Sequence, residues 1–284
     1  MPIKSLRLSY ELYKSATAFT LNPVIILHGL LGCKRNWRSV ACSLNAKGFG
    51  KVYCVDARNH GSSPWSTDTS YESMAEDLLN FIHDLSVTNV SVIGHSMGGK
   101  IAMTAALIEP TMIDRLVVVD IAPHLSPNKA NTNLLVSLMS HVDLDARMAG
   151  CRNIYDLRAQ LMEEWKDTVP SLQQRAFVLS NLVEADGKAA WKVNVKAIQN
   201  GLDQIFSFPF SMADDSVSFD GPALFVAGEL SPFLGTEQMP YVLHFFPRAV
   251  RAQISGAGHW VNVDAPEVLS DTISIFLNST NACV

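Results

Sequence analysis

The sequence lacks any concentration of charge. Only 17% of its 284 residues are charged, and the formal net charge of −5 comes without a cluster of basic residues. It also lacks long apolar runs, because the longest ones, such as 23–27 and 116–119, have the length of a strand. A membrane-spanning helix needs roughly 18 apolar residues, and a nucleic-acid-binding surface needs basic patches. We therefore expect no membrane span and no nucleic-acid partner.

Cysteines are few, and their number is odd. The spacing of the five shows no pattern typical of a metal site: Cys33, Cys42, Cys54, Cys151 and Cys283. Such a set favours free thiols in a reducing compartment over disulfides. The glycosylation-type triplets at 89–91 and 278–280 follow no secretory signal, so we attribute them to chance. Basic residues within 1–14 are compatible with an organelle-targeting segment, although the alternation over 6–12 fits a half-buried strand better. We expect an intracellular protein, cytoplasmic or mitochondrial.

Short apolar segments alternate with amphipathic ones over much of the chain. The apolar segments predict strands at 6–12, 23–27, 51–55, 89–93, 116–119, 222–227 and 248–254. The amphipathic or alanine-rich segments predict helices at 37–47, 71–85, 100–109, 238–246 and 264–277. This alternation is typical of an α/β fold with a mostly parallel sheet and helices on both faces.

The alternation stops after residue 123. From 124 to 219 the pattern contains no convincing strand, and helical periodicity dominates, as at 133–141, 154–165 and 172–182. We therefore predict a helical cap, 124–219, inserted into an α/β core made of 1–123 and 220–284, and lying over the carboxyl edge of the sheet. Several of its apolar side chains would line a pocket if they faced the sheet, and otherwise pack within the cap: Leu134, Leu138, Met139, Trp165, Phe177, Trp191 and Phe206.

The most informative segment is Gly94-His95-Ser96-Met97-Gly98, between a predicted strand and a predicted helix. A serine in such a strand–turn–helix setting, with glycines two positions before and after, is typical of a nucleophile elbow. The glycines are needed because side chains at Gly94 and Gly98 would collide with the strand and the helix. We predict Ser96 as the nucleophile, with the side chain of His95 turned away from it.

A nucleophilic serine needs a base, and His259 is the best candidate. It follows the strand predicted at 248–254, and chemistry in open α/β sheets collects beyond the carboxyl ends of strands. The elbow fold places its histidine after the last strand. His28 is expected to shape the loop of the oxyanion hole, and His60 to support a turn.

The triad acid is less obvious. Its usual place, three residues after the glycine that closes the strand at 222–227, is occupied by Ser231, which cannot carry a negative charge. Asp120, at the end of the strand before the cap, is the preferred acid. The alternatives are Glu229, near the usual place, and a dyad of serine and His259 assisted by Ser231.

Two backbone N–H groups should form the oxyanion hole. One belongs to Met97, directly after the nucleophile, and the other to Leu30, after His28-Gly29. Gly29 and Gly32 let this second loop approach a substrate closely.

The sequence resembles a known family, the α/β-hydrolase domain-containing protein 11 family with its small bacterial esterase relatives. The resemblance spans nearly the whole chain and depends on six segments: 56–61 (DARNHG), 94–100 (GHSMGGK), 120–123 (DIAP), 181–187 (NLVEADG), 246–249 (FPRA) and 258–260 (GHW). It implies an α/β-hydrolase fold with a helical cap, and a role in lipid metabolism, in some relatives mitochondrial. It also implies aspartate at the Asp120 position and serine at the Ser231 position, whereas Glu229-Leu230 departs from the family's Gly-Asn.

These observations lead to one main hypothesis. A serine hydrolase of carboxylic esters or thioesters, with short-to-medium acyl groups, would use Ser96, His259 and Asp120 through an acyl-enzyme and would need no cofactor or metal. A peptidase or a carbon–carbon hydrolase on the same residues is an alternative, because the fold hosts many reactions. A non-catalytic ligand-binding protein or complex partner is the rival from another class. The predicted partner is a small-molecule acyl ester or thioester, and the sequence does not identify protein partners.

Overall fold

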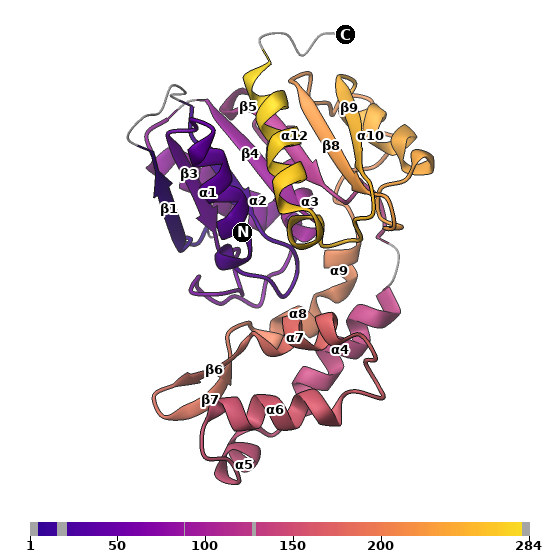
Figure 1. Cartoon of the computed structure of the whole chain (residues 1–284). Coiled ribbons are helices and arrows are strands. Elements are labelled where there is room, and N and C mark those ends of the chain that lie inside the picture. The colour runs from indigo at the N-terminus through magenta and orange to yellow at the C-terminus, as the bar shows by residue number, and fades with distance from the viewer. Residues whose placement is uncertain (1–4, 16–21, 88, 127–128, 280–284) are drawn as a thin grey trace.

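The computed structural model describes residues 5–15, 22–87, 89–126 and 129–279, so Cys283 and the first residues of the suggested targeting segment lie outside it. Its centre is a seven-stranded sheet in the order β1-β3-β2-β4-β5-β8-β9 (Figure 1). The strands are β1 (Tyr10–Lys14), β2 (Val24–Leu27), β3 (Lys51–Val55), β4 (Val90–His95), β5 (Ile113–Val119), β8 (Ala223–Gly228) and β9 (Ala249–Ile254). Only β1 pairs in the antiparallel sense, with β3; all other pairs are parallel, as predicted.

Helices cover both faces of this sheet. The core cluster on one face includes side chains of α2 (Tyr71–Asp84), α3 (Met97–Ile108) and α10 (Met239–Phe245). The cluster on the other face includes side chains of α1 (Arg38–Ala46), α11 (Val261–Asp264) and α12 (Pro266–Asn278). Short 3-10 helices complete the core at η1 (Lys34–Trp37), η2 (Pro110–Met112) and η3 (Thr236–Gln238). Within the described ranges, no helix is both long and apolar enough to cross a membrane.

Inner strands such as β2 and β8 are apolar at every position because both of their faces are covered. In β2, Ile25 and Leu27 pack into the cluster with α2 and α3, while Val24 and Ile26 pack into the cluster with α1 and α12. Successive side chains of a strand point to opposite faces, so a strand between two helical layers is apolar at every position. The carboxyl ends of these parallel strands then form one edge of the sheet.

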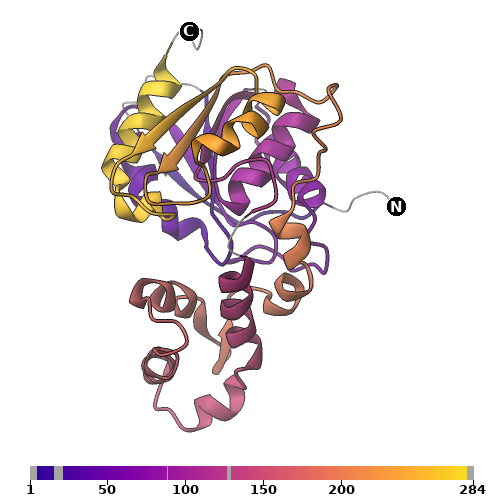
Figure 2. The same cartoon turned by 90° about the vertical axis from the view of Figure 1, so that its right-hand side faces the viewer.

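The segment between β5 and β8 forms a separate layer at one end of the sheet (Figures 1 and 2). We call residues 129–206 the cap. Its helices are α4 (Lys129–His141), α5 (Leu144–Ala149), α6 (Ile154–Glu164), α7 (Leu172–Leu179), α8 (Val195–Asn200) and α9 (Leu202–Phe206). The boundaries at 124 and 219 stay predictions.

The expectation that this segment contains no strand is wrong. β6 (Leu182–Ala185) and β7 (Lys188–Trp191) form an antiparallel hairpin, and α7 ends at Leu179 instead of 182 because the hairpin follows it. The turn is Asp186-Gly187, with φ of 51° and 76°, as the tight hairpin turn favoured by Asp-Gly requires. In the sequence, the Asp-Gly pair is the feature from which the hairpin could have been predicted. Strands of four residues are too short to show alternation against helical surroundings.

Candidate active site

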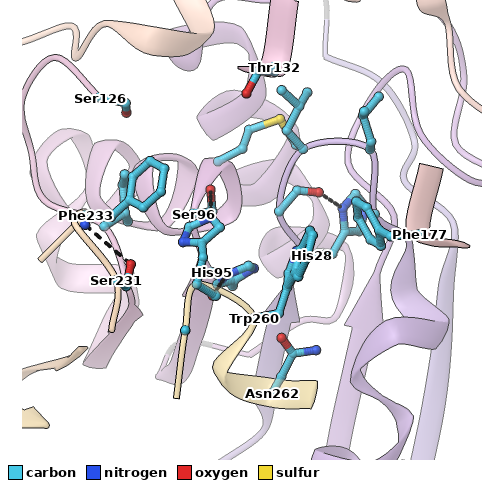
Figure 3. Close-up of a pocket in the computed structure, with 18 of the residues that line it drawn as sticks. His28, His95, Ser96, Ser126, Thr132, Phe177, Ser231, Phe233, Trp260 and Asn262 are labelled. Atoms are coloured by element: carbon cyan, nitrogen blue, oxygen red, sulfur yellow. Dashed lines mark hydrogen bonds between the residues drawn. The ribbon is translucent and has the colours of Figure 1, made fainter. Parts of the chain in front are cut away.

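Ser96 lies in the turn between β4 and α3 with a φ of 52°, a left-handed backbone conformation that is unusual for serine. A Cβ atom on Gly94 would lie 2.2 Å from the carbonyl oxygen of Gly98, and one on Gly98 would lie 2.6 Å from that of Leu27. Both positions therefore need glycine. The strained turn lifts Ser96 to the carboxyl edge of the sheet, where it lies at the centre of a pocket (Figure 3).

The imidazole of His259 lies between Ser96 and Asp120. Its Nδ1 is 2.7 Å from Oδ2 of Asp120, and its Nε2 is 3.1 Å from Oγ of Ser96. An ionised carboxylate can only accept, so Nδ1 carries the proton. The bare Nε2 then accepts the hydroxyl hydrogen of Ser96, which is the orientation that a general base requires.

Asp120 is fully buried at the end of β5 and has a φ of 54°. Its Oδ1 accepts the backbone N–H of Gly228 at 2.9 Å. Its Oδ2 accepts the hydroxyl of Ser231 in addition to the Nδ1–H of His259. A buried carboxylate is costly unless it is hydrogen-bonded, and these three donors compensate for the lost water.

The alternative acid lies in a different environment. The carboxylate of Glu229 accepts the N–H of Gly256 at 2.7 Å, and among the residues with described positions it has no hydrogen bond to His259. The hydroxyl of Ser231 contacts the carboxylate of Asp120 and not the imidazole. The structure thus brings Ser96, His259, Asp120 and Ser231 together, whereas Glu229, directly after β8, bonds to the turn after β9.

Two side chains that the sequence analysis did not connect with catalysis hold His259 in place. His95 donates from Nε2 to the backbone carbonyl of His259 at 2.8 Å, and burial lowers its own pKa to about 3, so it stays neutral. The ring of Phe233 stacks on the imidazole with centroids 4.1 Å apart. His95 does turn away from Ser96, as predicted, but toward the base. No local sequence signal marks Phe233.

The backbone amides of Leu30 and Met97 are available for a ligand. Neither donates to another group in the ranges that the structure describes, and both residues line the same pocket as Ser96. Met97 is the first residue of α3, and the first N–H groups of a helix lack intrahelical partners and favour negative charge. The two amides can therefore receive an oxyanion.

Two buried histidines support the turn that carries Leu30. The amide of Ala57 donates to Nε2 of His28 at 3.1 Å, so the other ring nitrogen donates to the carbonyl of Gly29. The amide of Leu31 donates in the same way to Nε2 of His60, also at 3.1 Å. Burial lowers the pKa of both rings, to about 3 for His60, so both stay neutral. The predicted structural roles of His28 and His60 agree with these contacts.

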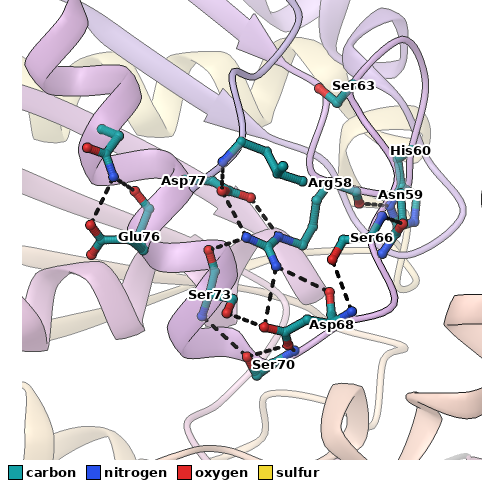
Figure 4. Close-up of polar contacts among 12 residues, drawn as sticks. Arg58, Asn59, His60, Ser63, Ser66, Asp68, Ser70, Ser73, Glu76 and Asp77 are labelled. Carbon is teal, nitrogen blue, oxygen red and sulfur yellow. Dashed lines mark hydrogen bonds and ion pairs between the residues drawn. The ribbon is translucent and has the colours of Figure 1, made fainter. Parts of the chain in front are cut away.

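A buried ion pair fixes the loop that contains His60. Arg58 donates from Nε to Oδ2 of Asp77 at 2.7 Å and from Nη2 to the carbonyl of Ser73 at 2.9 Å (Figure 4). Both side chains are at most 2% exposed. Removing one partner of such a pair leaves an uncompensated buried charge, so the pair holds the loop in one conformation.

The pocket is a cavity of about 520 Å³ between the sheet edge and the cap. Of the seven cap side chains considered above, Phe177 and Phe206 line it. Met139 and Trp165 are buried away from the cavity, and Leu134 is 36% exposed. A cavity wall depends on which side of each helix faces the sheet, and periodicity alone does not determine that.

Lys100, to which the sequence assigned no role, also lines the cavity. Its ammonium donates to the backbone carbonyls of His124, Phe206 and Ser207 at 2.7–2.8 Å. These carbonyls flank the two ends of the cap. Among the described side chains, no cluster of histidine, cysteine and carboxylate residues could hold a metal ion.

Comparisons with known proteins show the fold and the family of this chain. The sequence pattern of the alpha/beta hydrolase fold matches residues 22–266. The sn-1-specific diacylglycerol lipase ABHD11 of Xenopus laevis is 36% identical over 96% of this chain and 84% of its own length. The chain belongs to the α/β-hydrolase domain-containing protein 11 family. Esterase YbfF of Escherichia coli is 28% identical over 90% of this chain and 93% of its own.

A solved structure described as a marine microorganism esterase resembles the present structure over almost the whole chain. The TM-score is 0.86 at 34% identity, and the match covers 96% of this chain and 100% of that one. Relatives of the family are thus named lipases and esterases. They support an ester-hydrolysing function for this chain.

Proposed function

We propose that this protein hydrolyses carboxylic esters through a Ser96–His259–Asp120 triad. One observation carries the proposal: a continuous hydrogen-bonded row from Asp120 through His259 to Ser96, ending in an open cavity. Asp120 is favoured over Glu229 because its carboxylate, and not that of Glu229, is hydrogen-bonded to His259. Ser231 supports this carboxylate by donating its hydroxyl to it.

In the proposed reaction each of these groups has one role. Oγ of Ser96 attacks the acyl carbonyl while Nε2 of His259 accepts the hydroxyl proton, and Asp120 stabilises the resulting imidazolium. The amides of Leu30 and Met97 bind the oxyanion that forms. His259 then protonates the departing alcohol or thiol. Water attacks the acyl-enzyme with His259 as base and releases the acid.

The cavity favours short-to-medium acyl groups. Its volume of about 520 Å³ lies within the usual range for small-molecule pockets, and apolar side chains such as Leu135, Ile205 and Phe206 form its walls. Both oxygen esters and thioesters fit this chemistry, because the triad requires only an activated acyl carbonyl. The relative named a diacylglycerol lipase makes glycerol esters a class to test.

The other candidate functions have less support. A peptidase acting on a free amino terminus needs an acidic group, and the carboxylate lining the cavity, Asp264, already accepts the N–H of Gly258 at 2.9 Å. No specific contact favours a carbon–carbon hydrolase. A non-catalytic binding protein has no use for the strained elbow at Ser96 or for a histidine that accepts the hydroxyl hydrogen of this serine.

Labelling with a fluorophosphonate tests the proposal, together with turnover of p-nitrophenyl esters and acyl thioesters. We expect labelling and turnover in the wild type, and loss of both in Ser96→Ala. Ser126→Ala is the matched control, because Ser126 lines the same cavity but its hydroxyl has no hydrogen bond to a histidine among the described residues. Folded wild-type protein that neither labels nor turns over any ester would contradict the proposal and favour the binding protein.

The compartment is a separate proposal. The described cysteines Cys33, Cys42, Cys54 and Cys151 form no disulfide, which supports a reducing intracellular environment. Imaging of the tagged full chain beside mitochondrial and cytoplasmic markers distinguishes the two locations.

A further inference from the structure

The turn that carries Leu30 has a conformation that its sequence does not favour. The amide of Gly32 donates to the carbonyl of Gly29 at 3.0 Å, which closes a four-residue turn. Leu31, the third residue of this turn, has a φ of 58°, whereas Leu30 is not among the residues with positive φ. A turn with positive φ at its third position normally has glycine there. Leucine at this position needs restraint from outside the turn.

Two side chains provide that restraint from opposite sides of Leu31. His60, from the core, accepts the Leu31 amide at 3.1 Å. Asn181, from the cap, donates from Nδ2 to the Leu31 carbonyl at 2.9 Å. The two peptide groups that flank the Cα of Leu31 are thus both held in orientation. One of the two contacts exists only when the cap lies against the core.

Asn181 is itself rigidly held. It directly precedes the hairpin, its amide donates to the carbonyl of Val178 at 3.1 Å, and its carbonyl accepts the amide of Lys192 at 2.8 Å. It is 4% exposed. The segment at 181–187 belongs to the family resemblance, and the proposed reaction assigns it no role. Its first residue reaches 150 positions back along the chain to the oxyanion loop.

We propose that Asn181 is a positioning residue, which makes the orientation of the Leu30 amide depend on the position of the cap. This inference rests on the proposed function, because it assumes that the Leu30 amide binds the oxyanion. Without the contact, the Leu31 peptides can rotate toward the conformations that leucine prefers, and the amide of Leu30 is no longer held toward the reacting carbonyl.

The predicted effect has a kinetic signature. An oxyanion exists only in the transition states and tetrahedral intermediates, so a misaligned donor lowers kcat and leaves KM nearly unchanged. A residue that only shaped the acyl pocket would instead change KM, and would do so differently for short and long acyl groups.

The chain offers a matched control at the same boundary between cap and core. Asn194, at the start of α8, donates from its backbone to the carbonyl of Asn59 at 2.9 Å and from its side chain to Oδ1 of Asn59 at 3.1 Å. It is also a cap asparagine bonded to a core loop, but it does not contact Leu31.

The experiment compares Asn181→Ala with Asn194→Ala on p-nitrophenyl acetate and p-nitrophenyl octanoate. For Asn181→Ala we expect kcat to fall on the order of tenfold to a hundredfold for both esters, since removing an oxyanion donor altogether costs about a hundredfold or more. KM should change by less than about threefold. Asn194→Ala should keep kcat close to the wild-type value. A wild-type kcat in Asn181→Ala, or a change in KM alone, overturns the inference.

A second pair of variants tests the turn directly. Glycine adopts positive φ without steric cost, so in a Leu31→Gly background the turn should no longer need Asn181. We expect Asn181→Ala to lower kcat much less in that background, and an equal loss in both backgrounds overturns the inference. Asn181→Leu takes the place of alanine if Asn181→Ala does not fold. Failure of the proposed function is recognised separately, because the wild type would then neither label nor turn over any ester, or Ser96→Ala would keep the wild-type turnover.

Discussion

Asp120 combines features that a structural carboxylate would not need together. Its backbone is left-handed, its side chain is fully buried, and three donors converge on its two oxygens. Ser231 supplies one of these donors from the loop after β8, where hydrolases of this fold usually carry the acid. In the proposed triad the acid thus lies at the end of β5 instead of after β8, and its carboxylate reaches Nδ1 of His259 from there.

Replacing the carboxylate tests this assignment. In Asp120→Asn we expect kcat to fall by about 10⁴-fold, because an amide stabilises neither the required tautomer nor the imidazolium. Glu229→Gln should stay within about threefold of wild type, since Glu229 bonds to Gly256 instead of His259. Steady-state kinetics on a p-nitrophenyl ester, with circular dichroism to verify folding, distinguish the two. Near-normal turnover in Asp120→Asn would refute the role of Asp120.

At the scale of the element, α3 joins the nucleophile to the cap. Its first amide belongs to Met97, and one turn later Lys100 donates to carbonyls at both ends of the cap. The ammonium of Lys100 meets three carbonyls, and no hydrogen bond or ion pair joins it to a carboxylate among the described residues. Burial lowers the pKa of this lysine from 10.5 to about 7.

The lowered pKa predicts how stability depends on pH. Between the folded value of about 7 and the unfolded value of 10.5, the unfolded chain binds the proton and the folded chain does not. The free energy of unfolding should therefore rise with pH in this window, by at most about 1.4 kcal/mol per pH unit from this group. Lys100→Met should lack this contribution.

Chemical denaturation of both proteins at pH 7, 8 and 9 measures the effect as a difference. Subtracting the variant from the wild type cancels the titration of groups that both proteins share. The free energy of unfolding of the wild type, minus that of Lys100→Met, should increase as pH rises. A difference that stays constant with pH would show that Lys100 keeps its proton in the folded state.

At the scale of the whole molecule, the cap and the sheet edge together enclose the cavity. Neighbouring positions on α4 face opposite environments: Leu135 lines the cavity and is 8% exposed, whereas Leu134 is 36% exposed. The cap thus contributes part of the cavity wall, and substitutions on its inner side should change the selectivity for the acyl group without affecting the proposed triad.

Leu135→Phe tests whether the inner side of the cap controls acyl selectivity. The larger ring should reduce kcat/KM for an octanoate ester relative to an acetate ester on the order of tenfold, the scale expected when a pocket loses room for a methylene or two. Leu134→Phe is the control and should leave the ratio unchanged. Fluorophosphonate labelling should proceed in both variants. Equal ratios in the two variants would show that the acyl chain binds elsewhere.

The features of this protein that depend on local chemistry could be predicted from the order of its residues. Buried strands read as continuous apolar runs because both sheet faces are covered, and the elbow at Ser96 is recognisable because steric exclusion at Gly94 and Gly98 leaves a fixed spacing. His259 followed from its place after the last strand. The β6–β7 hairpin was not predicted, although the pair Asp186-Gly187 is typical of a hairpin turn.

Contacts between residues far apart in the chain could not be predicted in this way and became visible only in the folded structure. The contact between Asp120 and His259 spans 139 positions, and that between Asn181 and Leu31 spans 150. Both depend on the packing of parallel strands and of the cap against the sheet edge. Local patterns in a sequence report the period and the steric needs of one segment. They do not report which side chains of separate segments lie within hydrogen-bonding distance, and that proximity determines which carboxylate can orient the base.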